Sequence, residues 1–348
     1  MSNVTNGAIA KASHRKKIHD WIVVIILLVL LVAAFTISAN TGTIRLSPME
    51  LFRTLFGQGT PQQELILFEF RLPRMVISIL IGAGLAVSGC IMQGVSRNSL
   101  ADPGILGINA GAGLMVMLFV LLFPSMQTMN SLFLLPALAL IGSGAAAILI
   151  YALSYKKGEG ISPTRLLLSG IGVAAGISAT MIIMTLKLTP ESYTFVANWL
   201  AGSIWGSNWK FVMALLPWLI VLLPFAYYKS NVMNVLNLGD QTASGLGTPI
   251  EKERILLLAA AVGLASSSVS VSGGIGFVGL VAPHLARKLV GPKHKMLLVT
   301  CALVGALLVL VADTITRALP LQKEIPTGLI VAIIGAPYFL YLLSRSKG

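Results

Sequence analysis

Three arginines are the most unusual chemical groups in this sequence, because each lies beside a long apolar segment. Arg71 and Arg74 flank Pro73 directly before a charge-free run, and Arg317 follows another such run. A guanidinium at a rigid helix start presents a planar fork of donors that matches a carboxylate. The residues alone leave two interpretations open: ordinary anchors at a membrane interface, or a docking site for an acidic external protein.

A second candidate site lies in the polar stretch at residues 229–254. It contains the sequence LGDQTASGLG, whose glycines permit sharp turns and helix ends. The residues that we assign to this site are Leu238, Gly239, Asp240, Ala243, Leu246 and Gly247. The stretch either packs against its own helix ends or forms a short helical knob that fits a groove on a cytoplasmic partner.

The sequence contains no pattern typical of an enzyme or a metal site. It lacks GxxxxGK[ST], HExxH, CxxC and GxSxG, so we predict no P-loop, no metal and no catalytic residue in this chain. Asp313 is the only acidic residue near the interior of an apolar run, and we interpret it as a structural hydrogen-bond acceptor. Cys90 and Cys301 lie in apolar runs and could pair only if the fold brought them together.

The composition indicates a membrane protein. Of the 348 residues, 56% are hydrophobic and 11% are charged, and the mean hydropathy is +0.87. Soluble domains carry about 25% charged residues. The net charge of +13 does not indicate nucleic-acid binding, because the basic residues are spread over segment ends instead of forming one patch.

Charge-free runs of membrane length recur along the chain and predict an all-α polytopic membrane protein with ten transmembrane helices. The predicted spans are about 21–39, 74–95, 105–122, 132–154, 164–186, 210–228, 255–271, 275–290, 295–312 and 327–344. Short surface helices are expected after the first span, at about 47–56, and after the fifth span, within 187–209.

The distribution of basic residues predicts the orientation of the chain. Roughly twice as many Lys and Arg residues fall on the side of the termini as on the other side, so both termini are expected in the cytoplasm. Residues 1–19 are expected to form a disordered cytoplasmic tail, and residues 20–348 a single transmembrane domain. The stretch at 229–254 then becomes a cytoplasmic loop between the sixth and seventh spans.

Small residues mark the second and fifth spans. Gly82 and Gly89 are placed where helix backbones could approach closely. Gly170, Gly172 and Gly176 form a small-residue face on the fifth span.

Several sequence blocks together resemble the FecCD family of permeases. They are RLPR at 71–74, SGCIMQGVSRNSLADPGILGINAGAG at 88–113, WLAGS at 199–203, LGDQTASGLG at 238–247, GGIGFVGLVAPHLARKLVG at 273–291, and ADTITR with EIPTGLIVAIIGAPYFLYLL at 312–317 and 324–343. The blocks run in order over about 45–344. This family comprises the membrane permeases of ATP-binding-cassette importers for ferric siderophores, haem and cobalamin.

The resemblance implies that this chain is a permease subunit of an ATP-driven importer and forms the path for a ferric siderophore. Cobalamin or haem is the alternative cargo. The chain would itself be no enzyme and hold no cofactor, because two cytoplasmic ATPase subunits would use the ATP. The other implied partners are a second permease, identical or not, an extracytoplasmic binding protein, and the lipid of a bacterial cell membrane; nucleic acid is not among them.

The resemblance also implies roles for the candidate residues by their position in the blocks. Arg71, Arg74 and Arg317 match the arginines that receive glutamates of the binding protein. Residues 238–247 match the coupling loop that sits on the ATPase, and the helix with Gly170, Gly172 and Gly176 matches the helices that line the central path.

Two other function classes are compatible with individual residues. A secondary transporter or channel could capture an anion with the external arginines, and an intramembrane enzyme could use Cys90 or His284. The scarcity of charge inside the spans argues against a proton-driven carrier, because such a carrier needs a buried titrating relay.

Overall fold

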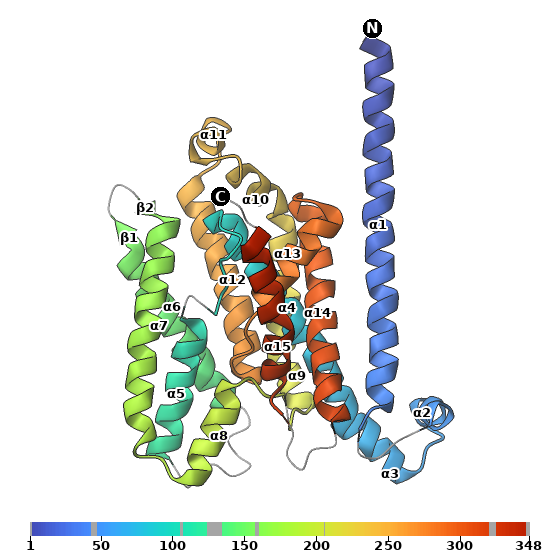
Figure 1. The fold of residues 1–348 in the computed structure, drawn as a ribbon, viewed down its shortest axis with the longest axis vertical. Helices are drawn as coiled ribbons and strands as arrows, with labels where there is room; N and C mark the ends of the chain where they lie inside the picture. Colours follow the sequence, from blue (N-terminus) through green and yellow to red (C-terminus); the bar gives the residue numbers. More distant parts are fainter. Residues whose placement is uncertain are drawn as a thin grey trace.

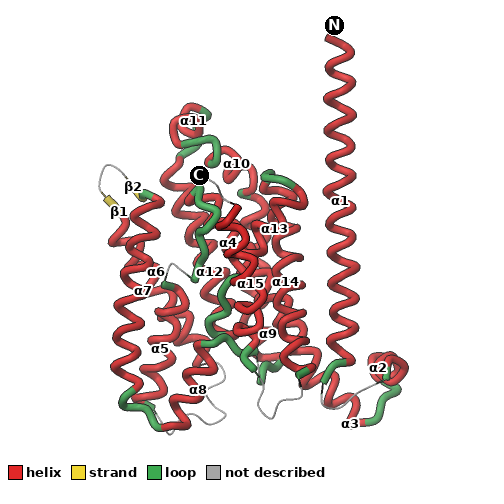
Figure 2. Tube along the Cα trace, in the orientation of Figure 1, coloured by secondary structure: helices red, strands yellow, loops and turns green. Residues whose placement is uncertain are grey.

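The computed structural model describes residues 2–42, 47–104, 107–123, 134–156, 160–204, 206–319 and 325–345. This part of the chain is a bundle of helices that run roughly along one axis (Figure 1 and Figure 2). The longer helices are α1 (Ser2–Asn40), α4 (Leu72–Ser96), α5 (Ile108–Leu122), α6 (Leu134–Ser154), α7 (Pro163–Thr185), α9 (Trp209–Tyr228), α12 (Ile250–Ser272), α13 (Val278–Val290), α14 (His294–Ala318) and α15 (Thr327–Arg345).

Shorter elements connect these helices at the ends of the bundle. They are α2 (Pro48–Leu55), α3 (Pro61–Glu64), the π-helical segment η1 (Leu65–Arg71), α8 (Pro190–Leu200), α10 (Ser230–Leu236), α11 (Asp240–Gly245), and the antiparallel strands β1 (Tyr155–Lys156) and β2 (Gly160–Ile161). The predicted surface helices correspond to α2 and α8. The small hairpin β1–β2 was not predicted, because two-residue strands carry no alternation of apolar and polar residues.

Seven helical segments of the described chain are long and apolar enough to cross a membrane. They are Arg15–Asn40, Pro61–Ser96, Leu134–Ser154, Thr164–Thr185, Trp209–Tyr228, Ile250–Ser272 and His294–Ala318. The other three predicted spans correspond to the shorter helices α5, α13 and α15. Helix α13 is short because the chain leaves the helical conformation before it, inside the bundle: Gly273 (φ 68°) ends α12, and Phe277 (φ 66°) precedes α13.

Helix α4 lies at the centre of the bundle and packs on α14, α12, α13 and α9. Glycines make these contacts close. A Cβ at Gly82 would collide with the backbone of Gly305, and a Cβ at Gly89 would collide with the backbone of Gly279. The small residues of the second predicted span therefore allow close helix approach, as the sequence predicts.

The contact between α4 and α14 also decides the state of the two cysteines. It brings Cys90 and Cys301 together in the core as buried free thiols. Cys301 Sγ donates to the carbonyl of Ala86 at 3.1 Å. The two residues are therefore neighbours, and both serve here as small buried side chains with free thiols.

The amino-terminal segment differs from the sequence-based expectation. Helix α1 begins at Ser2, so residues 2–19, predicted as a disordered tail, are helical. This segment contains one glycine and no proline, so no strong helix breaker separates it from the apolar run that follows. It extends past the rest of the bundle on the side where α11 lies (Figure 1).

The second span also begins earlier than predicted. Helical structure is continuous from Pro61 to Ser96, whereas the sequence indicated a start near residue 74. Segment η1 has the wider π-helical turn, and the N–H of Leu72 donates to the carbonyl of Leu67. Pro73 follows directly and has no N–H to offer, so it can occupy the start of α4 without breaking the helix.

Candidate functional site at the two ends of the bundle

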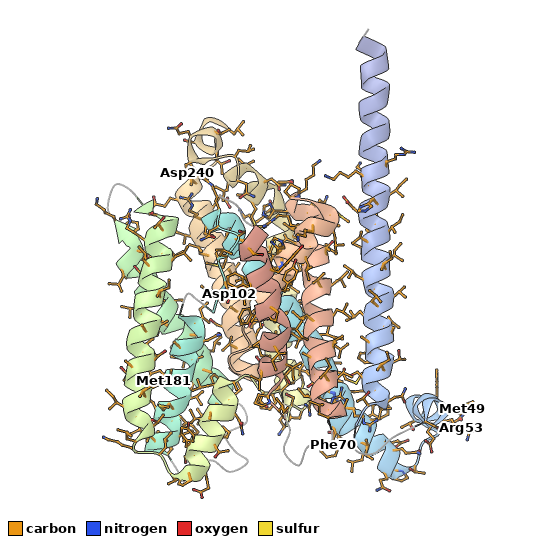
Figure 3. All side chains as sticks on the ribbon, in the orientation of Figure 1. Met49, Arg53, Phe70, Asp102, Met181 and Asp240 are labelled. Atoms are coloured by element: carbon orange, nitrogen blue, oxygen red, sulfur yellow. The ribbon has the colours of Figure 1, made fainter. Side chains whose placement is uncertain are left out.

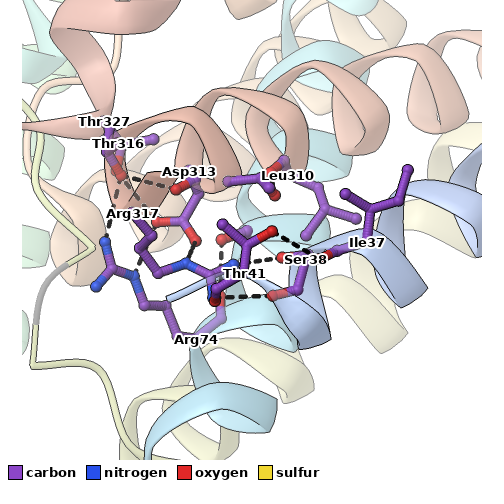
Figure 4. Close-up of polar contacts among 11 residues, drawn as sticks. Ile37, Ser38, Thr41, Arg74, Leu310, Asp313, Thr316, Arg317 and Thr327 are labelled. Carbon is purple, nitrogen blue, oxygen red and sulfur yellow. Dashed lines mark hydrogen bonds and ion pairs between the residues drawn. The ribbon is translucent and has the colours of Figure 1, made fainter. Parts of the chain in front are cut away.

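The predicted docking arginines converge at one end of the bundle, where α14 ends and α4 begins (Figure 4). Arg74 Nε donates to Asp313 Oδ1 at 2.9 Å, and Arg317 Nε donates to Asp313 Oδ2 at 3.1 Å. Thr327 Oγ1 also lies 3.4 Å from Asp313 Oδ1. Asp313 is fully buried, so its two carboxylate oxygens act as the acceptors that hold this end of the bundle together. This confirms its interpretation as a structural acceptor.

The same arginines bind the carboxyl end of α1. Arg71 Nη1 donates to the carbonyl of Ala39, and Arg317 Nη1 donates to the carbonyls of Ser38 and Thr41 at 3.0 and 3.1 Å. The last carbonyls of a helix have no partner within the helix and carry partial negative charge. The guanidinium groups therefore satisfy these acceptors and fix α1 to the bundle.

We name Arg71, Arg74, Arg317 and Asp313 the arginine cluster. The contacts described above limit how these side chains can bind an external partner. Arg71 and Arg74 are only 7% and 8% exposed, so they are engaged within the chain, whereas the docking interpretation, one of the two that the sequence left open, requires guanidinium groups that can reach an external carboxylate. The cluster contains one carboxylate and three guanidinium groups, so these four residues together carry net positive charge. Whether a binding protein docks on this charge stays a prediction.

The predicted coupling residues form a small projection at the opposite end of the bundle (Figure 1 and Figure 3). Helix α11 lies between two glycines with positive φ, Gly239 (107°) and Gly247 (79°). Leu238 and Leu246 are 61% and 62% exposed, whereas Ala243 is fully buried and anchors the projection. Residues 240–245 are therefore helical and project from the bundle, while Ala243 is buried; we call this projection the knob, and its fit to a cytoplasmic partner stays a prediction.

Asp240 connects this knob to the bundle. Arg254 Nη2 on α12 donates to Asp240 Oδ1 at 2.7 Å, and Arg97 Nη2, at the end of α4, forms an ion pair with the same oxygen. Partial burial raises the pKa of the Asp240 carboxyl, but the hydrogen bonds and charges of Arg254 and Arg97 outweigh it and lower the pKa below its usual value. The carboxylate therefore stays ionised at neutral pH.

Sequence reasoning did not assign partners to Asp240. Arg97 has φ 50° and ends α4, and its Nε donates to the carbonyl of Leu236 on α10 at 2.9 Å. The only sequence signal for Arg97 is a basic residue directly after an apolar span. Its contact with residues more than a hundred positions away depends on the fold.

The three glycines of the predicted path occupy different positions on α7. Gly170 is buried, with its carbonyl near Gly107 at the start of α5. Gly172 and Gly176 lie on the outer face, and a Cβ built on either would meet no atom within 4 Å. Leu168 and Ile182, on the same helix, are 64% and 68% exposed. In the described part of a single chain, Gly172 and Gly176 therefore face outward and do not line a path through the bundle.

Asp102 is a buried carboxylate to which the sequence analysis assigned no role. It lies in the connection between α4 and α5, between the two ends of the bundle (Figure 3), and is only 9% exposed. Its Oδ2 accepts the N–H of Gly104 at 3.2 Å, and its Oδ1 lies against Gly279 in the first turn of α13. Over the described ranges, no group of three or more His, Cys, Asp or Glu side chains is placed to hold a metal ion.

Comparison with known proteins identifies what kind of protein carries these two sites. Residues 29–345 match the sequence profile of the FecCD transport family. The chain belongs to the FecCD transport family. This FecCD permease is therefore a multi-pass bacterial membrane transport protein and not an enzyme.

Its relatives match it over nearly their whole length. It is 50% identical to the iron(3+)-hydroxamate import system permease protein FhuG of Bacillus subtilis (strain 168), over 94% of this chain and 97% of that protein. It is 41% identical to the iron-uptake system permease protein FeuC of the same organism, over 92% and 96%. A solved metal-chelate type ABC transporter in an inward-facing conformation is 31% identical and has a TM-score of 0.81, over 92% of this chain and 98% of that one.

Proposed function

We propose that this FecCD permease is the membrane subunit of an ATP-driven importer and forms the translocation path for a ferric siderophore. The observation that carries the proposal is the knob at α11, which projects from a transport permease that has no nucleotide-binding motif of its own. The names of the two Bacillus subtilis relatives support iron carried by an organic chelator as cargo. Haem or cobalamin carried by the same architecture is the second candidate.

In the proposed topology, the chain crosses the membrane ten times and both termini lie in the cytoplasm. The seven long apolar helices, together with α5, α13 and α15, supply the ten crossings. The N-terminus, the described end of α15 and α11 lie toward the same end of the bundle, which supports a common side (Figure 1). Residues 2–19 then form a cytoplasmic extension of the membrane-spanning part of α1, and residues 20–348 form one permease domain.

At the cytoplasmic end, the knob at Leu238–Gly247 would fit a groove on one of two ATPase subunits. Its exposed leucines, Leu238 and Leu246, provide the apolar surface for that contact. When ATP closes the two ATPases, the knob moves with them. Asp240 transmits the movement, because its ion pairs with Arg97 and Arg254 connect the knob to α4 and α12.

The path itself would form between two permease subunits. Gly172 and Gly176 lie on an outer face of α7 that no described part of this chain covers. A second FecCD permease, identical or related, would bring a matching face against it, and small side chains would leave room for a bulky cargo between the two copies. A weakly binding, uncharged wall would favour release of the cargo.

At the other end, an extracytoplasmic binding protein would dock near the arginine cluster. The net positive charge of the cluster would steer acidic side chains of that protein toward Arg71, Arg74 and Arg317. Because these side chains already bind Asp313 and the end of α1, direct pairing with a glutamate would require an exchange of partners.

The test is ATP-dependent uptake of radiolabelled ferric siderophores by cells with and without this permease, together with its ATPase and binding protein. Free haem and cobalamin serve as competitors. Loss of uptake for one ferric siderophore, restored by the wild-type permease, is the expected result. Loss of haem or cobalamin uptake with unchanged iron uptake would overturn the cargo. Uptake that survives removal of ATP would overturn the importer.

A further inference from the structure

An apolar cavity of about 450 Å³ opens among α6, α9 and α12, with Ile108 of α5 and Leu166 of α7 also in its lining, and it includes no residue of the knob or the arginine cluster. It is lined almost entirely by apolar side chains, among them Ile108, Leu140, Ile148, Ile255 and Leu258. Two glycines, Gly144 on α6 and Gly263 on α12, hollow it out. Helices α6, α7, α9 and α12 are long and apolar enough to cross a membrane, so the cavity lies among membrane-spanning elements.

We propose that this cavity binds one acyl chain of a membrane glycerophospholipid from the leaflet on the side of α11. This inference goes beyond the proposed function and does not depend on the cargo. The depth of the cavity supports it. Its lining runs along α12 from Ile255 to Ser266, which is about 16 Å at the helical rise of about 1.5 Å per residue. That length is about half of the ~30 Å hydrocarbon core, which is the thickness of one leaflet.

The rim of the cavity favours lipid over water as the occupant. Ile148 lines the cavity and is 71% exposed, and Trp218 on the facing helix α9 is 41% exposed. An apolar rim of this kind is unfavourable in water but matches lipid tails. The single hydroxyl at the deep end, Ser266 Oγ, has no partner in the described chain. It can rotate toward a carbonyl of its own helix, so the deep end requires no polar ligand.

The mouth of the cavity carries polar groups where a phospholipid has them. Tyr151 lines the cavity near the end of α6, on the side of α11, and its phenol can donate to an ester carbonyl. A surface depression that shares Ile255 with the cavity continues toward the start of α12 and includes Lys252 beside Glu251. Lys252 is exposed, and its ammonium matches the phosphate that every glycerophospholipid carries.

Native mass spectrometry of the detergent-purified permease, titrated with phosphatidylglycerol, tests the proposal. Gly144→Leu extends a side chain from a residue that lines the cavity, and its Cβ would meet no atom within 4 Å. Ala145→Leu adds the same bulk to the exposed neighbouring position outside the cavity. Gly144→Leu should weaken binding of one phosphatidylglycerol by about tenfold or more, as expected when buried methylene contacts are lost. Ala145→Leu should bind as the wild type.

The charge at the mouth has its own pair of variants. Lys252→Gln should weaken binding severalfold, whereas Lys293→Gln, at an exposed position on the same end of the bundle, should not. Equal lipid binding by the wild type and Gly144→Leu would overturn the proposal. Absence of a retained lipid in the wild type, as expected if a second copy of the chain covers the cavity, would overturn it as well.

A fluorescence measurement keeps the test independent of protein yield. Trp218 lines the cavity, so subtracting the signal of Trp218→Phe isolates its emission. Phosphatidylglycerol brominated on its acyl chains should quench Trp218 at a lower lipid fraction in the wild type and Ala145→Leu than in Gly144→Leu. Identical quenching curves for Ala145→Leu and Gly144→Leu would contradict a bound acyl chain.

Discussion

Arg74 Nε lies 2.9 Å from Asp313 Oδ1, and this contact ties the first turn of α4 to the last turns of α14. Asp313 also accepts from Arg317 and Thr327, and Arg317 reaches the carboxyl end of α1 by donating to the carbonyl of Ser38 (Figure 4). One buried carboxylate is therefore shared by helices that are far apart in the sequence.

Asp313→Asn should destabilise the protein strongly. The substitution leaves Arg74 and Arg317 buried without their carboxylate, and breaking a buried ion pair by removing one partner costs about 3–5 kcal/mol. The apparent melting temperature of the detergent-solubilised permease is the measurement. Glu191→Gln, at an exposed position in the first turn of α8, serves as the control and should melt with the wild type. Equal melting of Asp313→Asn and the control would show that the pair is dispensable.

The docking prediction can be separated from this stability effect by the sign of the charge change. Arg74→Gln removes one positive charge from the arginine cluster and should weaken binding of the partner binding protein, most clearly at low salt. Asp313→Asn adds net positive charge and should leave docking unchanged or strengthen it, when measured below its melting temperature. The affinity of the binding protein for each immobilised permease variant, measured at two ionic strengths, distinguishes the two effects. Weakening by both variants would indicate that the cluster only maintains the structure.

Leu246→Glu should abolish coupled transport without unfolding the bundle. Leu246 is 62% exposed, so a charged side chain there is solvated in the permease, but it would be buried without a partner against an ATPase groove. Transport per cell and permease abundance are measured together. Leu289→Glu places the same charge at an exposed apolar position at the end of α13 and should transport normally. Normal transport by Leu246→Glu would refute the coupling role.

Asp240→Asn should uncouple hydrolysis from transport with little effect on stability. The Asp240 side chain is 47% exposed, and exposed ion pairs contribute only about 0.2–1 kcal/mol. Because the folded-state pKa of Asp240 is lowered, its ion pairs are fully formed at neutral pH and are lost only as pH falls through that lowered pKa. The ratio of ATP hydrolysed to siderophore imported should rise at neutral pH. An unchanged ratio would show that Asp240 only fixes the knob.

Two glycine substitutions of equal size should have opposite effects. Gly82→Ala forces a Cβ into the backbone of Gly305 and Ala306, where overpacking costs about 1–3 kcal/mol. Gly172→Ala places its Cβ in open space on α7 and gains up to about 1 kcal/mol of helix propensity. Thermal unfolding of both variants is the measurement. Similar melting of the two proteins would contradict the close approach of α4 and α14.

The sequence by itself determined the membrane class, most helices and the family. These features depend on local properties: charge-free runs set the length of spans such as α9 and α12, prolines mark helix starts at Pro48 and Pro190, and the glycines of LGDQTASGLG permit the turns around α11. The family blocks could be read directly because their order along the chain is part of the sequence.

Only the tertiary structure decided which charged groups meet. Asp313 and Arg74 are more than two hundred residues apart, and so are the close glycines Gly82 and Gly305. Nothing local specifies such pairs, because the energy of a buried ion pair or a close backbone contact depends on how whole helices pack. The same reason explains why the sequence could single out Arg71, Arg74 and Arg317 as unusual, whereas their contacts with Asp313 and the end of α1 required the fold.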